Sequence, residues 1–383
     1  MRVVLFDLDG VLVRPRGYRA AVRATFAHFA HRWGLEPPEP READLALFEA
    51  HGITSEWDMV PLLLAALWHA ARGQGLALPP SLPDPAAEPV PPPARVAVSS
   101  IDIGPWIEPL TTSLSPGAIP SQEAWALHQK GYIPFAHLPT PLARALFAET
   151  REVRHAPITR VFQHYTLGSA TFTRTYGLPA AFETPSFLLR EDLPRPPAAW
   201  RRAVRQAHAR GACRVAVMTA RPSQPEGAGL NAAPEANLAL ELLEWDGVVP
   251  IVGLGDLAQF GPGEVWLKPH PAHALLALAR ALGLAPEEAH RWTRALLAHT
   301  SPPRLWPAGQ LALAVVEDTP PGLRAAQAAR AVLQRAYNEP VALLALGLSA
   351  DSHKARALAR TGARVYPSWP EVQAALTAWG CLA

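Results

Sequence analysis

Short apolar runs alternate with helical patterns through the second half of the chain. The runs typical of buried strands are 214–218, 248–252, 311–316, 341–346 and 364–366. The helical patterns between and around them are 198–210, 234–245, 271–283, 320–336 and 352–362. Strands that alternate with helices predict a parallel sheet with helices on both faces. The pattern therefore predicts an α/β fold with a doubly wound, Rossmann-like sheet.

The first part of the chain follows this pattern only at its start. Residues 3–6 are an apolar run that suits one more strand of the sheet, whereas 14–195 is mainly helical in pattern. Because 383 residues are many for one domain, we expect a core at 1–13 and 196–383. A large helical segment at 14–195 is then inserted after the first strand.

The stretch 78–95 inside this insert is rich in proline. That composition excludes an α-helix there and favours an extended surface loop or linker. A docking segment for a partner protein is the alternative interpretation.

Net charge, the longest apolar block and the number of cysteines indicate which partners and which cellular location to expect. A formal net charge of +2 is too small to argue for nucleic acid or an anionic membrane as a partner. The longest apolar block, 59–71, is too short to span a bilayer and predicts a buried helix. The only cysteines, Cys213 and Cys381, fit a reduced, cytoplasmic protein without a disulfide. The sequence does not indicate an oligomeric state.

Two aspartates follow the first strand directly, in FDLDGV. Inside a buried strand Asp7 and Asp9 would be costly unless paired. Ligands of doubly wound sheets bind at the carboxyl ends of the strands, however, and that is where these two carboxylates lie. A tight turn is the alternative, because Asp-x-Asp-Gly also suits a turn.

Polar side chains also follow other strands of the predicted sheet. Thr219 follows the second strand, Glu317 and Asp318 follow a later one, and Lys268 lies between them in WLKPHP. Each has an ordinary interpretation: a helix cap for Thr219, Glu317 and Asp318, and a solvated side chain for Lys268. Together they place two acidic pairs, a hydroxyl and an ammonium at one edge of one sheet.

This set of groups suits phosphoryl transfer. Mg²⁺ prefers carboxylate oxygens, which Asp7 and Asp318 offer. The metal and Lys268 would neutralise the phosphoryl oxygens, and Thr219 would donate a hydrogen bond to one of them. Asp7 would attack phosphorus, while Asp9 would protonate the leaving oxygen and then activate water.

Four motifs, in this order along the chain, resemble those of the haloacid dehalogenase (HAD) superfamily: FDLDGV, the apolar run that ends in MTAR, the lysine of KPHP, and VVEDTPPGLRAA. The resemblance covers residues 1–13 and about 196–383, and implies that the insert is a C1-type cap. For the site it implies the nucleophile Asp7, the acid/base Asp9, the phosphate ligands Thr219 and Lys268, and a Mg²⁺ site formed by Asp7, Glu317, Asp318 and the backbone carbonyl of Asp9.

Two features depart from the common pattern of that family. The insert is much longer than a usual C1 cap, and Arg221 stands in MTARP where small polar residues are more usual. Arg221 either reaches the substrate or braces its loop.

We expect a Mg²⁺-dependent phosphohydrolase that acts on a small phosphorylated metabolite through an aspartyl-phosphate. A phosphomutase or phosphotransferase would use the same residues, and a non-catalytic binding protein on a degenerate core is the alternative from another class. The sequence does not identify the substrate.

Overall fold

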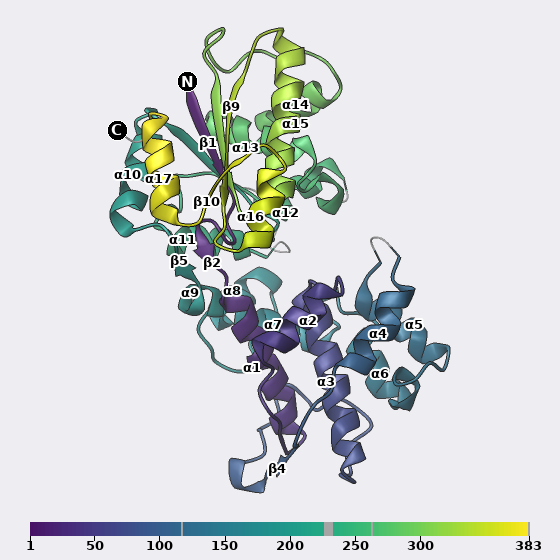
Figure 1. The fold of residues 1–383 in the computed structure, drawn as a ribbon. Helices are drawn as coiled ribbons and strands as arrows, with labels where there is room; N and C mark the ends of the chain where they lie inside the picture. The colour runs from purple at the N-terminus through teal and green to yellow at the C-terminus, as the bar shows by residue number, and fades with distance from the viewer. Residues whose placement is uncertain (116–117, 226–232, 262, 382–383) are drawn as a thin grey trace. The chain divides into compact units, whose positions relative to one another are not determined.

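A computed structural model describes the chain except residues 116–117, 226–232, 262 and 382–383 (Figure 1). The chain divides into two compact units. The core unit comprises Met1–Pro15 and Asp192–Ala383, and the insert comprises Arg16–Glu191. These bounds lie within a few residues of those expected from the sequence.

A six-stranded sheet forms the centre of the core unit, in the order β10-β9-β8-β1-β6-β7. Every neighbouring pair in it is parallel. Its strands are β1 (Arg2–Phe6), β6 (Arg214–Met218), β7 (Ile251–Val252), β8 (Ala312–Glu317), β9 (Ala342–Leu348) and β10 (Arg364–Tyr366). The predicted α/β fold with a parallel sheet is therefore confirmed.

Helices cover both faces of this sheet, because alternate residues of its strands point to opposite sides. Val3 and Leu5 of β1 belong to one apolar cluster, and Val4 and Phe6 to another. The first cluster packs on α13 (Pro271–Ala281), α14 (Pro286–Leu297) and α15 (Pro320–Tyr337). The second packs on α10 (Ala198–Ala209), α11 (Glu235–Leu242) and α17 (Trp369–Ala378). The short helices α12 (Leu254–Leu257) and α16 (Ser352–Ala359) complete this unit.

The edge strand β7 is shorter than the run 248–252 predicts. Only Ile251 and Val252 pair with β6. The amides of Val248 and Val249 donate instead to the carbonyl oxygen of Trp245, in the turn after α11. Pro250 has no amide hydrogen to donate to the ladder, so it takes part only through its carbonyl oxygen, which accepts from the amide of Val217 at 2.9 Å.

The prediction that the two cysteines are free thiols is wrong. Cys213, just before β6, forms a disulfide with Cys381, which follows α17. Both residues are buried against the second cluster. The two cysteines are 168 positions apart in the sequence, so no local pattern predicts this pairing. It depends on α17 packing beside the start of β6.

The chain passes between the two units twice, and a small two-stranded ribbon of the core unit lies next to both crossing points. Strand β2 (Val13–Arg14) pairs antiparallel with β5 (Leu193–Pro194). The amide of Arg195 also donates to the carbonyl oxygen of Leu12, at 2.8 Å. The chain thus leaves and re-enters the core unit on neighbouring strands.

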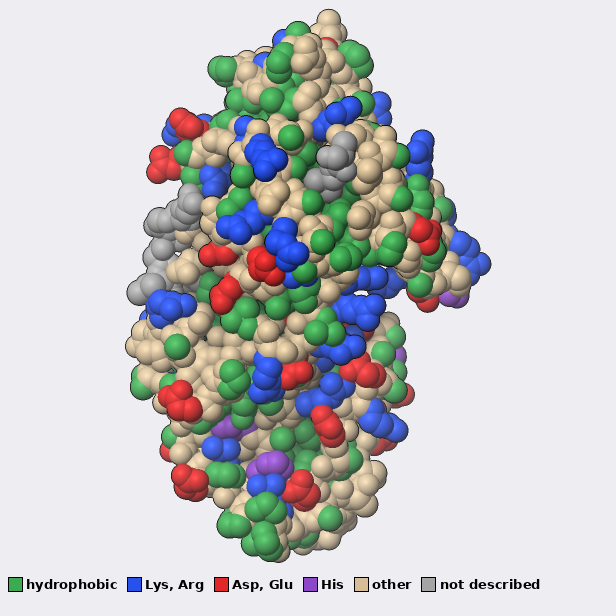
Figure 2. Space-filling model, turned by 90° about the vertical axis from the view of Figure 1, so that its left-hand side faces the viewer, with side chains coloured by type: hydrophobic (Ala, Val, Ile, Leu, Met, Phe, Trp, Pro, Cys, Tyr) green, Lys and Arg blue, Asp and Glu red, His purple; other side chains and the backbone are tan. Residues whose placement is uncertain are grey.

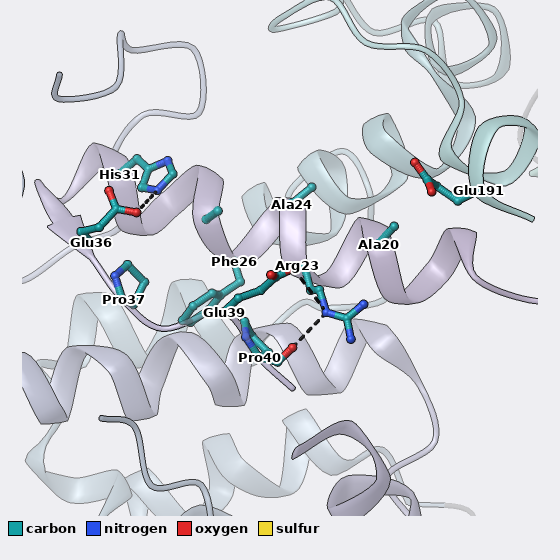
Figure 3. A pocket seen from close by; sticks show the side chains of 11 residues that line it. Ala20, Arg23, Ala24, Phe26, His31, Glu36, Pro37, Glu39, Pro40 and Glu191 are labelled. Carbon is teal, nitrogen blue, oxygen red and sulfur yellow. Dashed lines mark hydrogen bonds and ion pairs between the residues drawn. The ribbon is translucent and has the colours of Figure 1, made fainter. Parts of the chain in front are cut away.

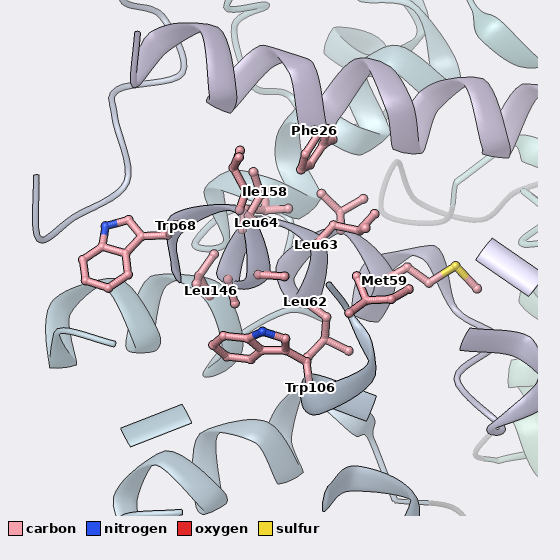
Figure 4. Packing of buried hydrophobic residues seen from close by; sticks show 14 of the residues in the cluster. Phe26, Met59, Leu62, Leu63, Leu64, Trp68, Trp106, Leu146 and Ile158 are labelled. Atoms are coloured by element: carbon pink, nitrogen blue, oxygen red, sulfur yellow. The ribbon is translucent and has the colours of Figure 1, made fainter. Parts of the chain in front are cut away.

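The insert is mainly helical and has its own apolar core, shown in Figure 4. The segment 59–71 lies within one of its helices and is largely buried, as predicted. Among the described residues, no helix is both long and apolar enough to cross a membrane. The helices of the insert are α1 (Gly17–Arg32), α2 (Glu42–Ala50), α3 (Glu56–Gly73), α4 (Gly104–Ser113), α5 (Pro120–Gln129), α6 (Thr140–Phe147), α7 (Pro157–Leu167), α8 (Ser169–Tyr176) and α9 (Phe187–Glu191), and its strands β3 (Leu35–Glu36) and β4 (Val96–Ala97) pair in parallel.

The proline-rich stretch 78–95 contains no α-helix, as predicted, but it is fixed to the insert rather than hanging free. The indole of Trp33 donates to the carbonyl oxygen of Ser81, and that of Trp68 to the carbonyl oxygen of Pro79, both at 3.3 Å. These contacts hold the stretch along α1 and α3.

Candidate active site

Asp7 lies at the carboxyl end of β1, in the middle of the sheet. Its amide donates to the carbonyl oxygen of Val316 in β8, at 3.0 Å, which extends the parallel ladder by one residue. Its carboxylate oxygen Oδ1 accepts from the amide of Leu8 and from the ammonium of Lys268, each at 2.7 Å. The residue is 7% exposed, so two donors fix a nearly buried carboxylate.

Glu317 and Asp318 bring two further carboxylates to Asp7. Glu317 is the last residue of β8, Asp318 follows it, and one oxygen from each of the three carboxylates lies within 4.8 Å of the others. Two glycines make room for them. A Cβ at Gly322 would lie 1.7 Å from Oε1 of Glu317, and one at Gly10 2.2 Å from Oδ2 of Asp318.

Lys268 is a buried bridge and not a solvated side chain. Its Nζ lies 2.7 Å from Oδ1 of Asp7 and 2.7 Å from Oε1 of Glu317, and its side chain is 10% exposed. Burial alone lowers the pKa of Lys268, but the charges of Asp7 and Glu317 outweigh burial and raise it above its usual value. The ammonium therefore stays charged between two carboxylates.

The remaining negative charge is not fully compensated. Burial, followed by the charge of Asp7, raises the pKa of Glu317 well above its usual value. The same two causes raise the pKa of Asp318 to about 6, although Lys354, 3.6 Å away, acts in the opposite direction. Both pKa shifts therefore follow from burial and from the closeness of the carboxylates to one another.

These residues fit a divalent cation. Three carboxylates meet one ammonium, and Oε2 of Glu317 is buried without a hydrogen-bond partner in the described part of the chain. Hard divalent cations take such oxygens as ligands. Asp7, Glu317 and Asp318 are thus a candidate metal site, as predicted, whereas the backbone carbonyl of Asp9 stays a predicted ligand.

Thr219 follows β6 directly and is buried. Its amide donates to the carbonyl oxygen of Val252 at 3.0 Å, and its hydroxyl oxygen accepts from the amide of Arg221 at 3.2 Å. The next helix described after it begins only at Glu235, so Thr219 is not a helix cap. Its predicted role as a phosphate ligand stays a prediction.

Asp9 is more open than Asp7, with 35% of its side chain exposed. Both of its carboxylate oxygens accept from Arg221, whose guanidinium also meets Asp192. Arg221 therefore joins its loop to Asp9 and Asp192, which agrees with a bracing role, and a contact with the substrate stays the alternative. Sequence reasoning missed Asp192, because EDLPRPP contains no recognisable motif.

Two pockets elsewhere contain none of the predicted site residues. One of about 440 Å³ lies within the insert beside α1 (Figure 3). Its basic side chains Arg23 and His31 face carboxylates, because Nε of Arg23 lies 3.5 Å from Glu39 and Nε2 of His31 lies 3.5 Å from Glu36. Another of about 520 Å³ lies beside β7. The candidate chemistry is thus at the acidic cluster.

Acidic and basic side chains are interspersed on the face of the protein that Figure 2 shows. This mixture agrees with the small net charge of +2.

Comparison with known proteins gives a fold and no family. No family model and no curated protein matches the chain. Target ZR25 of the Northeast Structural Genomics Consortium is similar to it with a TM-score of 0.62 and 14% identity, over 99% of each chain. Phosphatase Tt82 from Thermococcus thioreducens is similar with a TM-score of 0.44 and 16% identity, over 89% of this chain and 92% of that one. At 14% identity the first likeness shows the fold alone.

Proposed function

We propose that this protein is a Mg²⁺-dependent phosphohydrolase of the HAD type, acting on a small phosphomonoester through an aspartyl-phosphate. One observation supports this most: Asp7 is held by Lys268 at the end of a central strand, and Glu317 and Asp318 offer carboxylate oxygens within 4.8 Å. The groups that would serve as nucleophile, cation and metal ligands thus lie close together.

In the first step, a carboxylate oxygen of Asp7 forms a bond to phosphorus, and the bond from phosphorus to the ester oxygen breaks. Asp9 supplies the proton that the departing oxygen needs, which makes the product an alcohol. Lys268 stabilises the charge that develops on the phosphoryl oxygens, and Thr219 donates its hydroxyl hydrogen to one of them.

In the second step, Asp9 takes a proton from water, and the water oxygen attacks phosphorus. The bond between Asp7 and phosphorus breaks, which releases orthophosphate and restores the carboxylate. Asp9 therefore returns to its protonated form, ready for the next ester.

Asp7, Glu317, Asp318 and the backbone carbonyl of Asp9 would hold the Mg²⁺. When bound, the metal supplies positive charge to the phosphoryl oxygens and offsets the repulsion between them and Asp7. The closeness of the three carboxylates supports this assignment, because one oxygen from each lies within 4.8 Å of the others.

The insert would act as a C1-type cap that restricts the site to small phosphorylated metabolites. Its position in the chain, between β1 and β6, supports this role, as does the paired ribbon β2–β5 at its two crossings. A cytoplasmic location stays a prediction.

The test is hydrolysis of p-nitrophenyl phosphate, with and without EDTA. We expect Mg²⁺-dependent release of p-nitrophenol by the wild-type protein and none by Asp7→Asn. Asp246→Asn is the matched control, because Asp246 is an exposed aspartate that lies outside the cluster. Absence of turnover over a panel of phosphorylated metabolites would favour the non-catalytic binding protein, and transfer of phosphate to an acceptor other than water would favour a phosphotransferase or mutase.

A further inference from the structure

Arg221 is a buried guanidinium that meets two carboxylates from distant parts of the chain. Its Nε lies 2.9 Å from Oδ2 of Asp9, and its Nη2 lies 2.5 Å from Oδ1 of Asp9. The same Nη2 lies 2.9 Å from Oδ2 of Asp192. Arg221 and Asp192 have side chains that are 2% and 1% exposed. The ion pair between Arg221 and Asp192 is therefore almost completely removed from water, whereas the Asp9 side chain is 35% exposed.

This arrangement fixes the direction of the Asp9 carboxylate. A guanidinium is a planar fork, and two parallel bonds to one carboxylate set the rotation of that group as well as its position. Asp192 accepts from the same Nη2, so the guanidinium is paired with a second carboxylate besides that of Asp9. The exposed third of Asp9 is then presented in one orientation.

An acid/base group must lie within hydrogen-bond reach of the oxygen that it protonates, so its orientation affects the rate. Arg221 itself has no such task in the two steps above. Its contacts with Asp9 go through both carboxylate oxygens, and its loop is tied to Thr219 through the amide of Arg221, 3.2 Å from Oγ1. Arg221 thus connects the acid/base group to the loop that carries the predicted phosphate ligand.

We propose that Arg221 is a positioning residue, which holds Asp9 toward the leaving-group oxygen, and that Asp192 holds Arg221 in turn. This inference rests on the proposed function. It predicts that the loss of Arg221 resembles the loss of Asp9 and not a general loss of structure.

Two aryl phosphates separate these possibilities. p-Nitrophenolate leaves readily as an anion and needs little help from an acid, whereas the phenolate of phenyl phosphate needs more. The value of kcat/KM reports on the step in which the ester bond breaks, whichever step limits kcat. A defect in proton donation should therefore reduce kcat/KM for phenyl phosphate more than for p-nitrophenyl phosphate.

The experiment compares kcat/KM for both esters in wild type, Arg221→Gln, Arg221→Lys, Asp192→Asn and Asp9→Asn. Arg201→Gln is the matched control, because Arg201 is 11% exposed and paired with Glu244 but does not touch Asp9. We expect Arg221→Gln to lose about a hundredfold on phenyl phosphate and at least tenfold less on p-nitrophenyl phosphate. Asp192→Asn should also lose more kcat/KM on phenyl phosphate than on p-nitrophenyl phosphate, but by a smaller factor. Arg201→Gln should show no such difference between the two esters.

A double variant gives the second readout. If Arg221 acts through Asp9, Asp9→Asn/Arg221→Gln should be no slower than Asp9→Asn alone. Equal losses on both esters, or losses that multiply in the double variant, would overturn the inference. Should Arg221→Gln not fold, Arg221→Lys decides the matter: it keeps the charge but lacks the fork, so it must still lose more on phenyl phosphate.

The same measurements distinguish a failure of this inference from a failure of the proposed function. If wild type hydrolyses neither ester, or Asp7→Asn keeps its rate, the proposed function fails and the inference falls with it. If Asp7→Asn is inactive and the Arg221 variants lose both esters equally, the inference alone is wrong.

Discussion

Reduction of the disulfide Cys213–Cys381 should destabilise the core unit substantially. The bond closes a loop with a sequence separation of 168 residues, and the chain-entropy relation gives about 5 kcal/mol for a loop of that length at 25 °C. Measured disulfides usually contribute about 2–4 kcal/mol. Either value is a large part of the roughly 5–15 kcal/mol by which domains are stable.

The assay is urea unfolding with and without dithiothreitol, together with hydrogen exchange read by mass spectrometry. We expect a lower midpoint and faster exchange in peptides of the core unit after reduction. Peptides of the insert should not change, because residues 16–191 form a separate compact unit with its own apolar core. The variant Cys213→Ser/Cys381→Ser is the control, since reductant should not alter it. A shift below about 1 kcal/mol, or thiols that react with a thiol reagent without reductant, would refute the reasoning.

Four further outcomes are expected. The pKa of Asp318 is raised to about 6, and a metal ligand must be ionised, so Mg²⁺ affinity measured by calorimetry should fall about tenfold from pH 8 to pH 5. Without metal, the raised pKa of Asp318 makes the folded state more stable at low pH. This contribution to the free energy of unfolding is complete below the ordinary carboxyl pKa and is lost as the pH rises through 6. Asp318→Asn should need more added Mg²⁺ for half-maximal activity than Glu317→Gln, because we expect Asp318 to be the more direct ligand; equal requirements would contradict this. Gly322→Ala should lower activity and the melting temperature together, since its Cβ would lie 1.7 Å from Glu317; an unchanged protein would show that this packing is wrong. Deletion of 78–95 should lower the melting temperature, because it leaves the indoles of Trp33 and Trp68 without their acceptors, but should change kcat/KM less than about tenfold, or 1.4 kcal/mol; a larger loss in a folded variant would place the stretch in the site.

The parts of the site that follow strands directly could be predicted from the sequence. The apolar runs before Asp7, Thr219 and Glu317 locate strand ends, and parallel strands bring those ends to one edge. The buried cluster of Asp7 with Glu317 and Asp318 follows from that rule and is found in the structure. Local pattern and topology were sufficient there.

Partners that depend on packing could not be predicted. Asp9 and Arg221 are 212 positions apart, and Asp192 lies in a segment without a motif. The disulfide likewise depends on α17 returning to the start of β6. The short edge strand has a local cause, Pro250, but an edge position is not visible in sequence. Tertiary contacts decided each of these features.

The ribbon β2–β5 makes the insert equivalent to one greatly enlarged β-hairpin loop. Val13 pairs with Pro194 and Arg14 with Leu193, so the two ends of the insert start about one strand spacing apart, roughly 4.8 Å. A short turn closes such a gap in ordinary hairpins. A core unit of this design can therefore exchange its whole inserted segment, for a longer or shorter one, without moving any strand of its sheet. Under the proposed cap role of the insert, changes in substrate preference would then need the replacement of only one continuous piece of the gene.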